Sequence, residues 1–190
     1  MEIILAENHG FCYGVKRAVE MANEAADGKG KSYTLGPIIH NPQVVGRLES
    51  KGVSPIQEVA DIDEGTMIIR SHGVGPAIYA EAEEKGLHIL DATCPHVKKA
   101  QQDAKSVIED GMTLVILGEK NHPEVKSINL WADNKGIIIE DEKSAQKLQI
   151  VEKMGVVVQT TFSQFKFNSI IEILEKKSKN LKVFKTICNA

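Results

Sequence analysis

Short apolar runs alternate along the chain with stretches in which apolar residues recur at helical spacing. The runs predict strands at 2–6, 66–70, 88–90, 155–158 and 181–184. Two helix faces are predicted from Val15, Ala18, Val19, Ala22 and Ala26, and from Val97, Ala100, Ala104, Val107 and Ile108. Two further helices are predicted over 77–85 and 163–177.

This alternation predicts the fold class. Strands that alternate with helices form parallel sheets, because each helix carries the chain back to the start of the next strand. The expected fold is therefore α/β, built of repeated small parallel-sheet units. In such sheets ligands bind beyond the carboxyl ends of the strands. Residues that directly follow predicted strands are thus the candidates for function.

The chain also repeats itself when residues 1–81 are laid over residues 83–163. The matched pairs are Cys12 with Cys94, His40 with His122, and Leu35-Gly36 with Leu117-Gly118. One coincidence would mean little. A cysteine, a Leu-Gly pair and a histidine in a single register indicate an internal duplication.

The repeat predicts the domain organisation. The first α/β unit is expected over residues 1–86 and the second over 87–180. The strand at 181–184 leads to Cys188 as the strand at 88–90 leads to Cys94, so residues 181–190 are expected to begin a third unit. We expect the units to surround a central pseudo-threefold site, with two units present and the third only begun.

Seven side chains follow predicted strands and are expected at one edge of their units: Cys12, His40, His72, Cys94, His122, Thr160 and Cys188. Equivalent cysteines from three repeats can meet only near the pseudo-threefold centre. Each cysteine is also expected near a helix N-terminus, where the positive end of the helix dipole favours a thiolate.

Three converging thiolates require a cation to offset their repulsion. Soft sulfur ligands select zinc, copper(I) or an iron–sulfur cluster. Structural zinc prefers four ligands, often in Cys-x-x-Cys pairs, and the sequence contains no such pair. We therefore favour a cluster with one open iron, with a three-sulfur zinc site and three small buried thiols as the alternatives.

The histidines indicate an anionic ligand. His40, His72 and His122 are expected at the same edge, where imidazole N–H groups and helix N-termini can donate to phosphate oxygens. Metal ligation is the competing interpretation of these rings. Glu124 is expected in the first turn of a helix, either as a proton donor near the open iron or as a solvated acid that complements the helix dipole. Thr160 could relay that proton or fix the substrate.

Charge and composition exclude several function classes. The net charge of −3 gives no basic field for nucleic acid or an anionic membrane. The first eight residues are too short and acidic for a signal peptide, and no apolar run approaches the roughly 20 residues that span a bilayer. Three cysteines do not fit a secreted disulfide framework. We expect a cytoplasmic protein that binds neither nucleic acid nor membranes.

Seven ordered motifs across the whole chain resemble the IspH/LytB family, the 4-hydroxy-3-methylbut-2-enyl diphosphate reductases of the non-mevalonate isoprenoid pathway. The motifs are Gly10-Phe11-Cys12-Tyr13-Gly14-Val15, Ile39-His40-Asn41-Pro42, Ser71-His72-Gly73-Val74, Asp91-Ala92-Thr93-Cys94-Pro95, His122-Pro123-Glu124-Val125, Gln159-Thr160-Thr161 and Thr186-Ile187-Cys188-Asn189-Ala190.

The resemblance implies a role for each candidate residue. Cys12, Cys94 and Cys188 would ligate a [4Fe–4S] cluster whose unique iron binds the allylic hydroxyl of the substrate. The substrate would be bound by His40, His72 and His122 at its diphosphate end and by Thr160 near its hydroxyl. Glu124, with Thr160 close to the hydroxyl, would deliver protons. Two electrons from a ferredoxin- or flavodoxin-type donor would then give isopentenyl and dimethylallyl diphosphate.

The same resemblance implies a third α/β unit after the third cysteine, which this chain lacks, and we expect weak or no activity from the chain alone. A non-catalytic iron–sulfur redox or sensor module is the second hypothesis, and a zinc hydrolase with three thiolates is the third.

Overall fold

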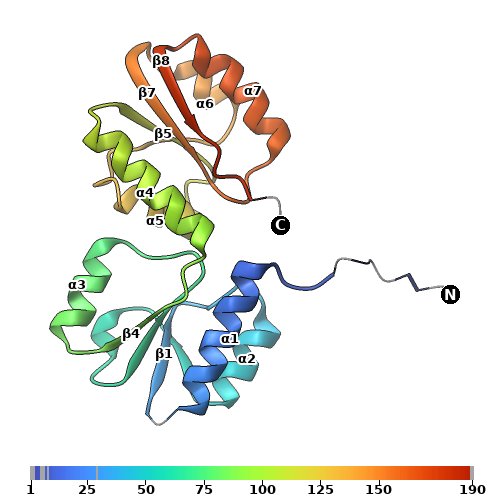
Figure 1. The fold of residues 1–190 in the computed structure, drawn as a ribbon, viewed down its shortest axis with the longest axis vertical. Coiled ribbons are helices and arrows are strands. Elements are labelled where there is room, and N and C mark those ends of the chain that lie inside the picture. The colour runs from blue at the N-terminus through green and yellow to red at the C-terminus, as the bar shows by residue number, and fades with distance from the viewer. Residues whose placement is uncertain (1–2, 5–6, 8, 29, 189–190) are drawn as a thin grey trace.

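The computed structural model describes residues 3–4, 7, 9–28 and 30–188, which form two α/β units, one above the other in Figure 1. Each unit contains a four-stranded sheet. All the pairings between neighbouring strands are parallel. The predicted fold class of repeated parallel-sheet α/β units is confirmed.

The first sheet has the strand order β2-β1-β3-β4. Its strands are β1 (Ser32–Leu35), β2 (Val53–Ile56), β3 (Thr66–Ile69) and β4 (His88–Asp91). Around it lie α1 (Tyr13–Asp27), α2 (Pro42–Ser50), the short 3-10 helix η1 (Val59–Asp61) and α3 (Pro76–Glu84). Ile68 packs with α1 and α2, whereas Met67 and Ile69 pack on the side of η1 and α3. Because this strand is buried on both faces, its residues 67–69 form a continuous apolar run.

The second sheet repeats this arrangement with the order β6-β5-β7-β8. Its strands are β5 (Thr113–Leu117), β6 (Ile137–Ile139), β7 (Val151–Val158) and β8 (Ser178–Phe184). Its helices are α4 (Pro95–Glu109), α5 (Pro123–Leu130), α6 (Glu142–Lys147) and α7 (Gln164–Glu175). Val157 packs with α4 and α5, and Val156 and Val158 pack with α6 and α7. Both units are therefore three-layer sandwiches.

The last strand of each sheet lies next to a predicted boundary between units. β4 pairs with β3 in the first sheet, although residues from 87 onward were assigned to the second unit. β8 pairs with β7 in the second sheet, whereas residues 181–184 were expected to open a third unit. The reason is that β3 and β7 each leave an open edge, which the following strand fills before the chain reaches the next cysteine. Strand pairing alone does not fix where a domain ends, so the predicted boundaries stay predictions.

The other predicted elements match the structure to different degrees. The helices predicted at 77–85 and 163–177 correspond to α3 and α7 within two residues. The strand predicted at 2–6 lies mostly outside the described residues, and Ile3 and Ile4 within it have no strand assignment. Among the helices that the structure describes, none is long and apolar enough to cross a membrane.

Hydrogen bonds across a seam join the two units. The Ser127 hydroxyl, on α5, donates to the carbonyl oxygen of His72 at 2.9 Å. The indole nitrogen of Trp131 donates to the carbonyl oxygen of Val74 at 2.8 Å. Lys98 on α4 pairs with Asp91 at the end of β4 at 2.6 Å. The loop that carries His72 in the first unit is therefore fixed to the second.

Candidate functional site

One cavity of about 550 Å³ is lined by residues of both units, in loops and at the N-terminal ends of helices. The eight predicted site residues all line it: Cys12, His40, His72, Cys94, His122, Glu124, Thr160 and Cys188. The structure therefore brings together side chains that are up to 176 positions apart in the sequence. Their chemical roles are a separate question, which depends on the geometry of each group.

Two of the cysteines occupy equivalent positions at helix N-termini. Cys12 is the N-cap of α1 and Cys94 is the N-cap of α4, and in the described part of the chain neither thiol forms a capping hydrogen bond. The first turns match as well, because Lys16 N donates to Cys12 O and Lys98 N donates to Cys94 O, each at 2.9 Å. Neither sulfur atom therefore stabilises its helix by capping it.

The third cysteine is held as the second one is. Cys94 N donates to Ser71 O at 3.0 Å, and Cys188 N donates to Thr160 O at 2.8 Å. Ser71 and Thr160 both follow the third strand of their unit, so the repeat extends to this backbone contact. All three cysteines are free thiols, with Cys12 exposed and the other two partly buried.

A glycine near Cys12 makes room for the sulfur atom of Cys94. A Cβ atom built at Gly14 would lie 2.5 Å from Cys94 Sγ and 3.2 Å from Cys94 Cβ. Such distances are too short for any side chain, so the turn after Cys12 and the Cys94 thiol are in direct contact. The first two cysteines are therefore neighbours across the seam.

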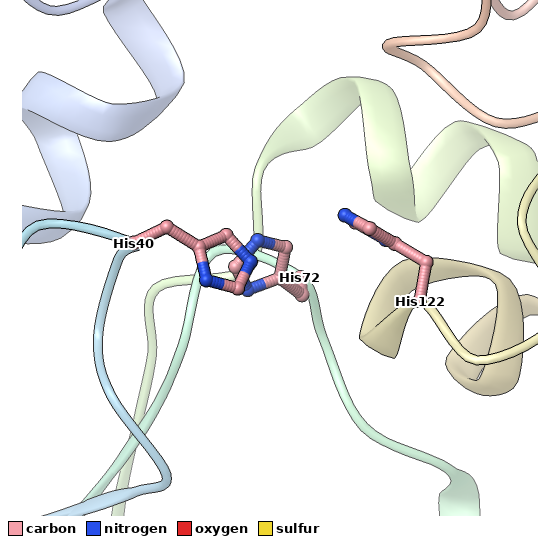
Figure 2. Close-up of side chains that lie close together, drawn as sticks. All are labelled: His40, His72 and His122. Carbon is pink, nitrogen blue, oxygen red and sulfur yellow. The ribbon is translucent and has the colours of Figure 1, made fainter.

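The three histidines form a cluster, which Figure 2 shows. The ring centroid of His40 is 4.5 Å from that of His72 and 5.9 Å from that of His122, and the last two centroids are 5.5 Å apart. One nitrogen from each ring lies within 4.8 Å of the others. His40 is exposed, whereas His72 and His122 are partly buried.

The surroundings keep the two partly buried rings neutral. Burial lowers the pKa of His72 to about 3, and the neighbouring His40, Arg70 and His122 act in the same direction. Burial also lowers the pKa of His122, again with help from His40 and Arg70, while Glu119 opposes the change. At neutral pH these imidazoles therefore carry no charge, and each offers one N–H donor and one acceptor nitrogen.

The hydrogen bond that His122 makes bears on whether the histidines would bind a metal or an anion. His122 Nδ1 accepts a hydrogen bond from the backbone N–H of Glu124 at 3.2 Å. A neutral ring that accepts at Nδ1 carries its proton on Nε2, so the nitrogen turned toward the other two rings is a donor (Figure 2). Metal binding at Nε2 would require the other tautomer and would set two N–H groups against each other. The arrangement therefore favours an anion.

Glu124 and Thr160 form a buried pair that lines the same cavity. Glu124 is only 2% exposed and Thr160 only 6%. Thr160 N donates to Glu124 Oε1 at 2.6 Å, and Thr160 Oγ1 donates to Oε2 at 2.9 Å. Burial raises the pKa of the Glu124 carboxyl, although both hydrogen bonds from Thr160 act against the rise. A buried carboxyl that holds its proton longer than usual is suited to donate it.

Sequence reasoning missed several residues that line the cavity, among them Ser71 and His96. The repeat could have found Ser71, because it corresponds to Thr160. His96 stands two residues after Cys94, in the first turn of α4, which was a weaker signal. Asn41 also lines the cavity, but its side chain accepts from Val44 N at 3.1 Å and so caps α2.

Comparison with known proteins gives a consistent result. The family described as LytB protein matches residues 3–190. The 4-hydroxy-3-methylbut-2-enyl diphosphate reductase of Geotalea uraniireducens is 47% identical over 190 residues, which cover the whole of this chain and 67% of the relative. The enzyme of the same name from Caldanaerobacter subterraneus is 46% identical over 195 residues and is covered to 68%. The chain thus spans about two thirds of the length of these relatives.

Solved structures agree with the sequence relatives. A structure of (E)-4-hydroxy-3-methyl-but-2-enyl diphosphate reductase, described as the terminal enzyme of the non-mevalonate pathway, has a TM-score of 0.86 and 42% identity, over 98% of this chain and 68% of that one. The corresponding reductase from Plasmodium falciparum has a TM-score of 0.91 and 31% identity, over 97% of this chain and 60% of that one. This chain belongs to the LytB family, as its motifs predicted.

Proposed function

We propose that this chain carries the reaction centre of a 4-hydroxy-3-methylbut-2-enyl diphosphate reductase, the activity for which its relatives are named. The reaction removes the allylic hydroxyl of the (E)-isomer with two electrons and two protons. A C–O bond breaks, a C–H bond forms and water leaves. The products are isopentenyl and dimethylallyl diphosphate, which differ in the carbon that receives the proton. The proposal rests on the one cavity in which three thiols, three imidazoles and a buried carboxyl meet.

Cys12, Cys94 and Cys188 would hold a [4Fe–4S] cluster. The donor set fits, because all three thiols are free, line one cavity and sit in equivalent backbone settings. Soft thiolates are the ligands that iron–sulfur clusters take. When bound, the cluster would supply the electrons and, at the iron without a cysteine, a Lewis acid for the substrate oxygen. The electrons would come from an external donor of the ferredoxin or flavodoxin type.

The histidine cluster would bind the diphosphate. The Nε2–H of His122 is fixed as a donor by the bond at Nδ1. His72 is held in position because its backbone carbonyl accepts from Ser127 across the seam. Neutral imidazoles bind an anion by N–H donation without the cost of burying a new charge.

Glu124 would hold the proton that the reaction consumes. Burial favours the protonated carboxyl, and Thr160 keeps both carboxyl oxygens in fixed positions through two hydrogen bonds. The Thr160 hydroxyl also lines the cavity, so it can orient the substrate hydroxyl beside the carboxyl. Positioning of this kind is the main contribution a protein makes to proton transfer.

Replacement of Glu124 by glutamine tests the proposal. Glutamine keeps the shape and can still accept from Thr160 N, but it carries no transferable proton. With the third α/β unit that the resemblance implies added to restore activity, turnover of the diphosphate substrate by the reduced protein should fall by about 10²- to 10⁴-fold. The visible spectrum of the anaerobic protein should stay that of the loaded cluster. Glu109→Gln, on the exposed side of α4, removes the same charge and should leave turnover unchanged.

Two outcomes would contradict the proposal. A wild type that turns over no substrate, together with an unchanged redox response in Glu124→Gln, would favour the non-catalytic iron–sulfur module. A colourless protein that contains zinc after anaerobic purification would favour the three-thiolate zinc site. An electron paramagnetic resonance spectrum that changes on addition of the substrate would support a ligand on the iron.

A further inference from the structure

Arg70 is a charged residue that forms no evident stabilising contact within its own unit. It follows β3 directly and is only partly exposed. Its Nε atom is fully buried and has no hydrogen-bond partner in the part of the chain that the structure describes. The ion pairs found among the described residues do not include it either. A guanidinium stays protonated at neutral pH, so this is a half-buried positive charge without a counter-ion.

The second unit shows what the position needs for packing alone. Register pairs place Ile68 beside Thr34 and Val157 beside Ile116, so Arg70 in the first unit corresponds to Gln159 in the second. Gln159 is buried, and both polar atoms of its amide form a hydrogen bond. Its Oε1 accepts from Glu119 N at 2.9 Å, and its Nε2 donates to Thr161 Oγ1 at 2.9 Å.

Both side chains pack against equivalent glycines. A Cβ atom at Gly36 would lie 2.6 Å from an Arg70 guanidinium nitrogen, and a Cβ atom at Gly118 would lie 2.8 Å from Gln159 Oε1. Each position therefore holds a planar polar group close to a glycine. The neutral amide of Gln159 meets this need, so the charge of Arg70 goes beyond what the fold requires.

The charge of Arg70 acts on the histidine cluster. It lowers the pKa of both His72 and His122, in the same direction as burial and the neighbouring rings. The groups that act on these two rings are His40, Arg70, Glu119 and the rings themselves, and Glu119 is the one acid among them. At His122 the opposing effect of Glu119 is larger than that of Arg70, whereas no acid acts on His72. With the rings neutral, Arg70 therefore leaves a positive potential at His72. An anion is attracted by this potential, and a metal cation is repelled.

We propose that Arg70 is the fixed positive charge of the diphosphate subsite and acts as a positioning residue through space. The inference rests on the proposed function, because it takes the anion at the histidine cluster to be a diphosphate. Arg70 does not line the cavity, so it attracts the anion without a direct contact. It also lets the histidines bind as neutral donors, so that anion binding requires little proton uptake.

Calorimetric titration of the cluster-loaded protein with inorganic diphosphate tests the inference. Arg70→Gln introduces the residue type found at the equivalent position of the second unit. Arg70→Lys keeps the positive charge but removes the planar guanidinium group. Arg70→Gln should bind about tenfold more weakly at pH 8, the size expected for one unit charge acting on a multiply charged anion across a partly buried site. Arg70→Lys should stay within about threefold of the wild type. Arg47→Gln, an exposed site on α2, should bind as the wild type does.

Histidine titration by nuclear magnetic resonance gives a readout that a packing defect would not produce. In Arg70→Gln the pKa of His72 and His122 should rise, because one source of repulsion is gone. The affinity of this variant should then recover as the pH falls from 8 to 6, more than that of the wild type. Equal affinity in Arg70→Gln and Arg47→Gln would overturn the inference. Equal losses in folded Arg70→Gln and Arg70→Lys would overturn it too, since the charge would not be the cause.

The proposed function has a separate test in the same experiment. If the wild type does not bind inorganic diphosphate, or if His72→Ala binds it as well as the wild type does, the diphosphate subsite itself is wrong. If the wild type binds, His72→Ala does not, and Arg70→Gln is unaffected, only the inference about Arg70 fails.

Discussion

Replacement of Gly14 by alanine tests how strictly the position of the second cysteine depends on the helix that follows the first. The new methyl group would lie 2.5 Å from Cys94 Sγ. Ordinary contact needs roughly 3.5 Å, so the sulfur must move by about 1 Å. Metal–ligand distances in a well-formed site vary by only about 0.2 Å. The displacement is several times what a cluster tolerates.

In the protein without iron, the same substitution should change the free energy of unfolding very little. The Cys94 thiol can rotate away from the methyl group, because it makes no capping hydrogen bond among the described residues. Gly14 lies in the first turn of α1, where alanine is intrinsically favoured by up to about 1 kcal/mol. The free energy of unfolding without iron should therefore be unchanged or slightly higher.

The assay is anaerobic reconstitution with iron and sulfide, followed by iron and acid-labile sulfide analysis and visible absorbance. We expect Gly14→Ala to bind the cluster about 10- to 100-fold more weakly, the range seen when groups that orient metal ligands are altered. The matched control is Gly46→Ala on α2, where a Cβ atom would meet nothing within 4 Å. It has a similar helix preference and no effect on sulfur.

Two results would refute this reasoning. If Gly14→Ala loads iron as completely as Gly46→Ala does, the Cys94 sulfur is not held at the cluster by its present position. A large loss of stability without iron would also refute it, because the methyl group would then disrupt the fold and not only the thiol.

Three further changes have expected outcomes that the structure fixes. Thr160→Val removes a hydrogen bond that favours the Glu124 carboxylate, so the pKa of Glu124 should rise further and the alkaline fall in kcat should move to higher pH; an unchanged pH profile would contradict this. Thr186→Val removes a buried hydroxyl that bonds the backbone of β7, and urea unfolding should show a loss of about 1–3 kcal/mol. Gly155→Ala brings a methyl group within 2.6 Å of both Val107 γ-carbons, so it should cost about 1–3 kcal/mol, which Val107→Ala should partly restore.

Much of the site was predictable because the repeat places equivalent residues at one edge of each sheet. Cys12 and Cys94 are each the N-cap residue of a helix, and the register of the duplication alone was enough to predict their equivalent positions. The contact between Glu124 and Thr160 was not predictable. It joins two loops whose separation depends on how β5 and β7 pair, and neither residue type in itself requires the other.

The sheet edges and the seam were the parts that the sequence pattern did not resolve. β2 (Val53–Ile56) contains a proline and β6 (Ile137–Ile139) has only three residues, so neither shows a clear strand periodicity. Trp131 belongs to no repeated motif, yet it bonds the first unit through Val74 O. Contacts between units depend on their relative orientation, which local periodicity does not encode.

The two closing strands have a consequence for anyone who wishes to dissect this protein. β4 completes the first sheet and ends at Asp91, and three residues later Cys94 begins the helix that covers the second sheet. A cut anywhere in that short connection leaves the edge strand β4 on one fragment and Cys94 on the other. The backbone connection that positions the Cys94 thiol is then lost. Separate expression of the halves would therefore give two complete α/β sandwiches, but not the site in which the three thiols meet. Inserted sequence or protease sites would thus do the most harm in the connections between a closing strand and the cysteine that follows it.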